Sequence, residues 1–94
     1  MLFSVFTLDN PNAADKRKAV HGEHVAHLKK AEDYGVTITV GGPLLSDDGT
    51  ASLGSLMVLE APDRASAEKF NRADPFHRNG VWGKVEIRRF DRKQ

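Results

Sequence analysis

The sequence contains no cysteine, and this absence excludes several classes of chemistry. Disulfide bonds, thiolate nucleophiles, cysteine-based zinc sites and iron–sulfur clusters all require that residue. No stretch approaches the roughly 20 consecutive apolar residues that cross a bilayer as a helix, so we expect no membrane partner. Residues 1–8 also lack the basic start and the apolar length of a secretory signal. We therefore expect a cytoplasmic protein.

The chain also lacks an excess of charge of either sign. Its 14 Lys and Arg residues are balanced by 13 acidic residues over 94 positions, which gives a formal net charge of +1. Nucleic-acid-binding surfaces normally show a basic patch or stripe, and the locally basic run at 88–93 is short and terminal. We therefore expect no nucleic-acid partner. The length predicts a single domain over residues 1–94.

Apolar periodicity and turn-forming residues predict six elements. Strands are expected at 2–8, 36–40, 53–60 and 81–90, and helices at 13–34 and 64–73. Asn12 is the expected N-cap of the first helix, Gly35 its stop, and Gly41-Gly42-Pro43 the end of the second strand, with Leu44 and Leu45 as an extension. The order β-α-β-β-α-β is the ferredoxin-like arrangement, an α+β fold with a four-stranded antiparallel sheet.

The first strand predicts a second copy of the chain as partner. Its two alternating faces are both apolar, with Leu2, Phe6 and Leu8 on one and Phe3 and Val5 on the other. Two helices cover only one face of a four-stranded sheet, and exposed apolar surface on that scale usually marks a partner surface. We therefore expect a homodimer that forms through the sheet face.

His24 lies within the apolar stripe of the first predicted helix. Val20, His27, Leu28 and Ala31 project to the same side at 100° per residue. A histidine there needs a buried hydrogen-bond partner. Asp74, which opens the sequence Asp74-Pro75-Phe76-His77, is the candidate partner. A histidine oriented by a carboxylate is a minimal device for proton transfer near neutral pH, although a purely structural pair is the competing interpretation.

Three stretches give the chain its resemblance to the YciI-like family (the YCII-related domain) of the dimeric α/β-barrel superfamily. They are Lys16-Arg17-Lys18 followed by His24-Val25-Ala26-His27-Leu28, then Gly41-Gly42-Pro43-Leu44, and Ala73-Asp74-Pro75-Phe76 followed by Gly80-Val81-Trp82. The resemblance implies that His24 and Asp74 form a catalytic dyad. It also implies a functional basic residue about two turns before the histidine, where Arg17 stands, and lyase- or isomerase-like proton transfer in some members.

Four further residues are candidates for contact with a substrate. Arg17 projects beside His24 on the helix and suits a substrate oxygen, although a guanidinium at a helix edge also serves to cover apolar surface. Gly42 and Pro43 belong to a stretch with little side-chain bulk, which suits one wall of a pocket. The stretch is not a phosphate-binding loop, because it lacks the lysine and the helix that follow in such loops. Phe76 follows the Asp-Pro pair and is either a substrate contact or part of the core.

His21, His24 and His27 do not predict a metal site. Their spacing of three residues turns the outer two side chains away from each other around a helix. No HExxH sequence is present, and His77 is the only other histidine. We therefore expect no bound metal.

Three functions are compatible with these residues. The first is a small cofactor-independent enzyme of lyase or isomerase type, in which His24 abstracts a proton from a small organic substrate, Asp74 fixes its tautomer and Arg17 binds an oxygen. The second is a non-catalytic dimeric module that binds a small molecule or assists an enzyme. The third is a monooxygenase of the kind found elsewhere in the superfamily, cofactorless or haem-dependent.

Overall fold

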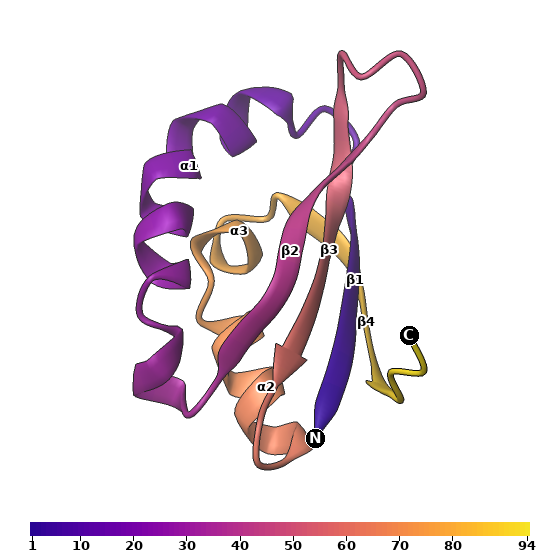
Figure 1. Ribbon diagram of the computed structural model, residues 1–94. Helices are drawn as coiled ribbons and strands as arrows, with labels where there is room; N and C mark the ends of the chain where they lie inside the picture. The colour runs from indigo at the N-terminus through magenta and orange to yellow at the C-terminus, as the bar shows by residue number, and fades with distance from the viewer.

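The computed structural model describes residues 1–94 and confirms the predicted order of elements, with two short helical segments added (Figure 1). The strands are β1 (Leu2–Asp9), β2 (Thr37–Leu45), β3 (Ser52–Glu60) and β4 (Trp82–Phe90). The helices are α1 (Ala14–Leu28), the 3₁₀ helix η1 (Ala31–Tyr34), α2 (Arg64–Arg72) and α3 (Pro75–Arg78).

The four strands form one antiparallel sheet in the order β2-β3-β1-β4. The long apolar strands β1 and β3 are the two central ones, as strands that are apolar on both faces predict. All the helices lie on one side of this sheet, with α3 between α1 and the strands (Figure 1). The fold is therefore the ferredoxin-like α+β arrangement expected from the sequence.

The core fills the space between the helices and the inner face of the sheet. Phe3 and Val5 of β1 pair with Leu59 and Met57 of β3, and all four are buried. Phe70 and Phe76 bring α2 and α3 onto this layer and are fully buried. The opposite face of the sheet carries no helix (Figure 1). The strand register places Leu8, Val40 and Leu56 on that face, and all three are exposed.

The first helix is shorter than its apolar periodicity predicts. It ends at Leu28, and the chain continues through η1 to Gly35, which has the left-handed φ of 71°. Ala31 is buried and Tyr34 packs on the core, so η1 continues the apolar stripe of α1. The pattern therefore could not distinguish one long helix from a helix followed by a 3₁₀ turn.

One local prediction was wrong, and for the second strand the longer of the two expected forms is correct. Asn12 does not cap α1, because its φ of 61° is left-handed and Ala13 occupies the N-cap without a side-chain bond. Asparagine tolerates this conformation, which suits the reversal between β1 and α1. The strand does not stop at Gly41-Gly42-Pro43 and includes the expected extension, because β2 continues to Leu45 as an edge strand, where proline is tolerated.

None of the helices combines the length and the apolar character that a bilayer crossing requires. The cytoplasmic location stays a prediction.

Candidate functional site

The two residues singled out from the sequence meet in the structure. The Nδ1 atom of His24 lies 2.8 Å from Oδ1 and 2.9 Å from Oδ2 of Asp74. His24 is 9% exposed and Asp74 is 1% exposed. A carboxylate accepts hydrogen bonds, so this contact assigns the proton of a neutral imidazole to Nδ1 and leaves the lone pair on Nε2.

Aromatic rings fix the plane of the His24 side chain. The imidazole lies on the Phe76 ring at 3.9 Å between centroids and 7° between planes. Trp82 meets it edge-on at 6.1 Å and 85°. Phe76 lies directly after Asp74 and Pro75, so α3 supplies both the carboxylate and the stacking ring. The imidazole therefore has one orientation, which points Nδ1 at Asp74.

Local structure holds Asp74 in place as well. The residue is the N-cap of α3, and its Oδ1 accepts a 2.8 Å hydrogen bond from the backbone N–H of Phe76. Pro75 at the first helical position needs no N–H partner, which suits the start of a helix. The same carboxylate therefore starts α3 and orients His24, and the Asp-Pro pair has both the structural and the histidine-binding role.

A cavity of about 790 Å³ opens between α1 and the β2–β3 hairpin, and His24 lies in its wall. Small-molecule sites in proteins commonly measure about 300–1,000 Å³. The lining includes Arg17, His21 and Val25 from α1 and Ile38, Ser55 and Met57 from the sheet. No hydrogen bond occupies Nε2 of His24, so this nitrogen is free to accept a proton.

Arg17 also lines this cavity, but a carboxylate that sequence reasoning missed already binds it. Its Nε and Nη2 donate to the two oxygens of Asp9 at 2.9 and 3.1 Å. Nη2 also lies 3.0 Å from the Gly54 carbonyl oxygen and 3.3 Å from the Ser55 hydroxyl. Only Nη1 has no hydrogen bond. Asp9 ends an apolar strand eight residues before Arg17, which is the signal that could have suggested the pair.

The remaining candidate residues take different positions. Gly42 and Pro43 line the cavity, together with Gly41. Phe76 does not line it, because the ring is fully buried behind His24. Of the two roles expected for Phe76, the structure thus shows the one in the core, where the ring supports the imidazole. The Arg17 guanidinium lies over the same ring, 4.7 Å from its centroid.

The other histidines have separate surroundings. His27 is buried, stacks on Phe70 at 4.6 Å and bonds the Phe70 carbonyl oxygen through Nε2 at 2.8 Å. His21 is exposed and lines the cavity, whereas His77 is exposed and does not. The structure contains no cluster of three or more His, Asp or Glu side chains that could hold a metal ion.

A hydrogen-bonded turn supports the far wall of the cavity, where Thr50, Ala51 and Ser52 lie. The Asp48 carboxylate accepts from the hydroxyls of Ser46 and Thr50 at 2.7 and 2.8 Å, and from the Thr50 N–H at 3.1 Å. These bonds, the one from Ser46 first, lower the pKa of Asp48 below its ordinary value. The turn therefore favours the ionised carboxylate.

Comparison with known proteins gives a consistent assignment. A family model described as the YCII-related domain matches residues 1–91. The Escherichia coli protein YciI is 30% identical over 94 residues, with 96% of each chain covered. An uncharacterized Haemophilus influenzae protein is 28% identical with the same coverage.

One solved structure is similar throughout. It is a 5-chloro-2-hydroxyhydroquinone dehydrochlorinase from Burkholderia phenoliruptrix, in complex with 2,5-dihydroxybenzoquinone. The two chains superpose with a TM-score of 0.85 at 27% identity, over 97% of this chain and 94% of the other.

Proposed function

The chain belongs to the YCII-related domain family, and we propose that it is a small enzyme of lyase or isomerase type that transfers protons on an oxygenated ring compound. One observation carries the proposal. A histidine whose Nδ1 is held by a buried carboxylate, and whose Nε2 has no hydrogen bond, lines a cavity of about 790 Å³. That arrangement is the one a general base requires.

In this proposal, each group has a defined task. Nε2 of His24 takes a proton from an O–H or C–H bond of the substrate, whose electron pair moves into the conjugated ring. In an elimination, a leaving group departs with its bonding electrons; in an isomerisation, a proton returns to another ring atom. Asp74 and Phe76 stabilise the imidazolium that forms, by charge and by its position over the ring face.

The similar dehydrochlorinase supports this substrate class. Its name describes the loss of hydrogen chloride from a chlorinated trihydroxybenzene, and its bound ligand is a dihydroxyquinone. Both are flat rings with acidic hydroxyl groups. The cavity of this chain has one wall, at Gly41 and Gly42, without side chains, which suits a flat ring.

The test uses 5-chloro-2-hydroxyhydroquinone as the first probe and measures chloride release and the visible spectrum of the quinone product. We expect turnover by the wild type, a loss of about 10²–10⁴-fold in His24→Gln, and no change in His77→Gln. His77 is the matched control because it is an exposed histidine outside the cavity. If the wild type and His24→Gln both bind the probe with equal affinity and neither converts it, the non-catalytic binding module is favoured instead.

We also propose that the protein is a homodimer joined through the outer face of its sheet. Val40 and Leu56 are 59% and 42% exposed on that face, next to Val58 and Phe6 of the neighbouring strands. Continuous apolar surface of this kind usually marks a partner surface. A second copy of the same face would bury it and leave the cavity open on the helix side.

A further inference from the structure

All the ionisable side chains that line the cavity come from one helix. They are Asp15, Arg17, Lys18, His21 and His24, all on α1. The opposite wall, from β2, β3 and their connecting turn, contributes only apolar residues, glycine, proline, serine and threonine. Any second ionisable side chain that exchanges a proton with a bound substrate must therefore come from α1.

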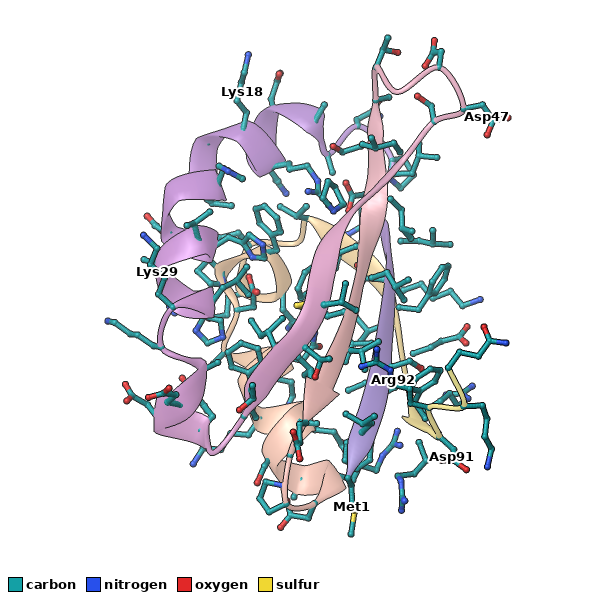
Figure 2. All side chains as sticks on the ribbon, viewed as in Figure 1. Met1, Lys18, Lys29, Asp47, Asp91 and Arg92 are labelled. Carbon is teal, nitrogen blue, oxygen red and sulfur yellow. The ribbon has the colours of Figure 1, made fainter.

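Only one of these groups is suited to be that second group. Histidine is the side-chain type whose charge ordinarily changes between pH 5 and 8, whereas aspartate, lysine and arginine stay charged there. Arg17 is in addition bound to Asp9. Lys18 lines the cavity, but its side chain extends upward out of the helix at the top of the view (Figure 2). His21 remains.

His21 stands one turn before His24 on the same wall. The two ring centroids are 6.3 Å apart, and the planes are inclined by 42°. His21 is exposed and has no hydrogen bond to the rest of the protein, so it can turn toward a ligand and exchange protons with water. A hydrogen bond from each ring spans about 2.6–3.2 Å between heavy atoms. Rings at this separation therefore allow one substrate on their cavity side to contact each of them through a different atom.

We propose that His21 is a second catalytic residue, the proton donor that works with His24 as base. This inference rests on the proposed function and adds the group that returns a proton to the substrate. In a tautomerisation, neutral His24 takes the proton of a ring hydroxyl, the O–H electron pair forms a carbonyl, and the ring double bond takes a proton from protonated His21. His24 ends protonated and His21 neutral, and exchange with solvent restores both.

The experiment uses 1,2,4-trihydroxybenzene under argon, whose ring C–H between two hydroxyl-bearing carbons exchanges by this tautomerisation. Loss of the ring C–H signal in D₂O, followed by proton NMR, measures both proton transfers without any leaving group. The variants are His21→Ala, His24→Gln and the control His77→Ala. Alanine at the exposed position 21 favours the helix, so folding is expected to be retained.

We expect the wild type and His77→Ala to accelerate exchange with a bell-shaped pH dependence. His21→Ala should lose about 10²-fold, lose one limb of the pH profile and recover activity when imidazole is added to the buffer. A structural role would give neither the altered profile nor the rescue. Exchange in His21→Ala equal to that in His77→Ala would overturn the assignment of His21 alone. No acceleration by the wild type would overturn the proposed function, and this inference with it.

Discussion

Asp9 and Arg17 form a paired contact across the start of the fold, with Nε and Nη2 of the guanidinium on the two oxygens of one carboxylate. Their side chains are only 10% and 13% exposed. The guanidinium lies over the Phe76 ring, and the His24 imidazole stacks on the same residue. The end of β1 is thus connected to the candidate base through three contacts, Asp9–Arg17, Arg17–Phe76 and Phe76–His24.

Asp9→Asn tests whether this pair holds Arg17. The amide presents an N–H where the guanidinium needs an acceptor, which leaves one of the paired bonds unmade. We expect a loss of about 1–3 kcal/mol in the free energy of unfolding, measured by urea titration. The Nε–H signal of Arg17 in nitrogen-15 NMR should also weaken through faster exchange with water.

Glu68→Gln is the control for that experiment. Glu68 pairs with Arg64 on the surface of α2, with side chains 34% and 51% exposed. An exposed pair of this kind contributes about 0.3–0.5 kcal/mol. Equal effects of the two substitutions would show that burial gives the Asp9–Arg17 pair no additional strength.

Asp74→Asn tests the tautomer of His24. Oδ1 also accepts the Phe76 N–H, so the amide oxygen is expected to stay there and the amide nitrogen to face Nδ1. Two N–H groups would then oppose each other, and the imidazole proton should move to Nε2. We expect the rate of chloride release from 5-chloro-2-hydroxyhydroquinone to fall by about 10⁴-fold, as in the corresponding change of a serine protease triad.

Nitrogen-15 NMR of the imidazole ring measures this change directly. In the wild type at neutral pH we expect the protonated nitrogen of His24 to be Nδ1, and in Asp74→Asn to be Nε2. Unchanged tautomers together with unchanged activity would show that Asp74 is only a helix cap.

The sequence was sufficient to predict the order of the elements and the meeting of His24 with Asp74. Both depend on local signals: the apolar stripe of a helix around a polar residue, and an aspartate before proline. Two features could not be read in this way. The end of α1 depends on how Ala31 and Tyr34 pack, and the place of Phe76 depends on its contact with His24.

Gly54→Ala tests a close approach between the central strands. An added Cβ would collide with the Thr7 carbonyl, so the backbone must move. Because the Gly54 carbonyl also accepts a bond from Arg17, the shift should disturb the cavity wall. We expect a loss of at least about 1–3 kcal/mol by urea unfolding.

Gly42→Ala provides the comparison, because a Cβ at position 42 meets no atom within 4 Å. We expect a change below about 0.5 kcal/mol there. A similar loss in both variants would contradict the steric explanation.

The Asp63 carboxylate is expected to make the stability of the fold depend on pH in the acid range. Its carboxylate caps α2 by accepting the Ser66 N–H at 2.8 Å, and this bond lowers the pKa of Asp63 below the ordinary value of 3.8. A lowered pKa in the folded state means that the carboxylate stabilises the fold above pH 3.8 and loses that contribution as the pH falls toward the folded-state value.

Asp63→Asn separates the charge from the cap. Asparagine caps helices about as well as aspartate, so we expect most of the stability at neutral pH to remain. Its free energy of unfolding should fall less steeply than that of the wild type below pH 3.8. Parallel acid curves for the two proteins, measured by urea titration, would show that another group controls this range.

Leu56→Lys tests the homodimer. Leu56 is in the central strand β3, opposite Phe6, on the face without helices. A lysine there would place two unpaired ammonium groups in a two-fold interface and raise the dimer dissociation constant by about 100-fold or more. Sedimentation at micromolar concentration should report twice the chain mass of 10.4 kDa for the wild type and a smaller mass for the variant.

Ala26→Lys is the control, since Ala26 is exposed on α1 and lies outside the cavity lining. It adds the same charge on the helix side and should leave the dimer intact. A wild type that sediments as a folded monomer would contradict the interface outright. Equal dissociation in both lysine variants would indicate a general effect of charge, and would place the contact between copies away from the sheet face.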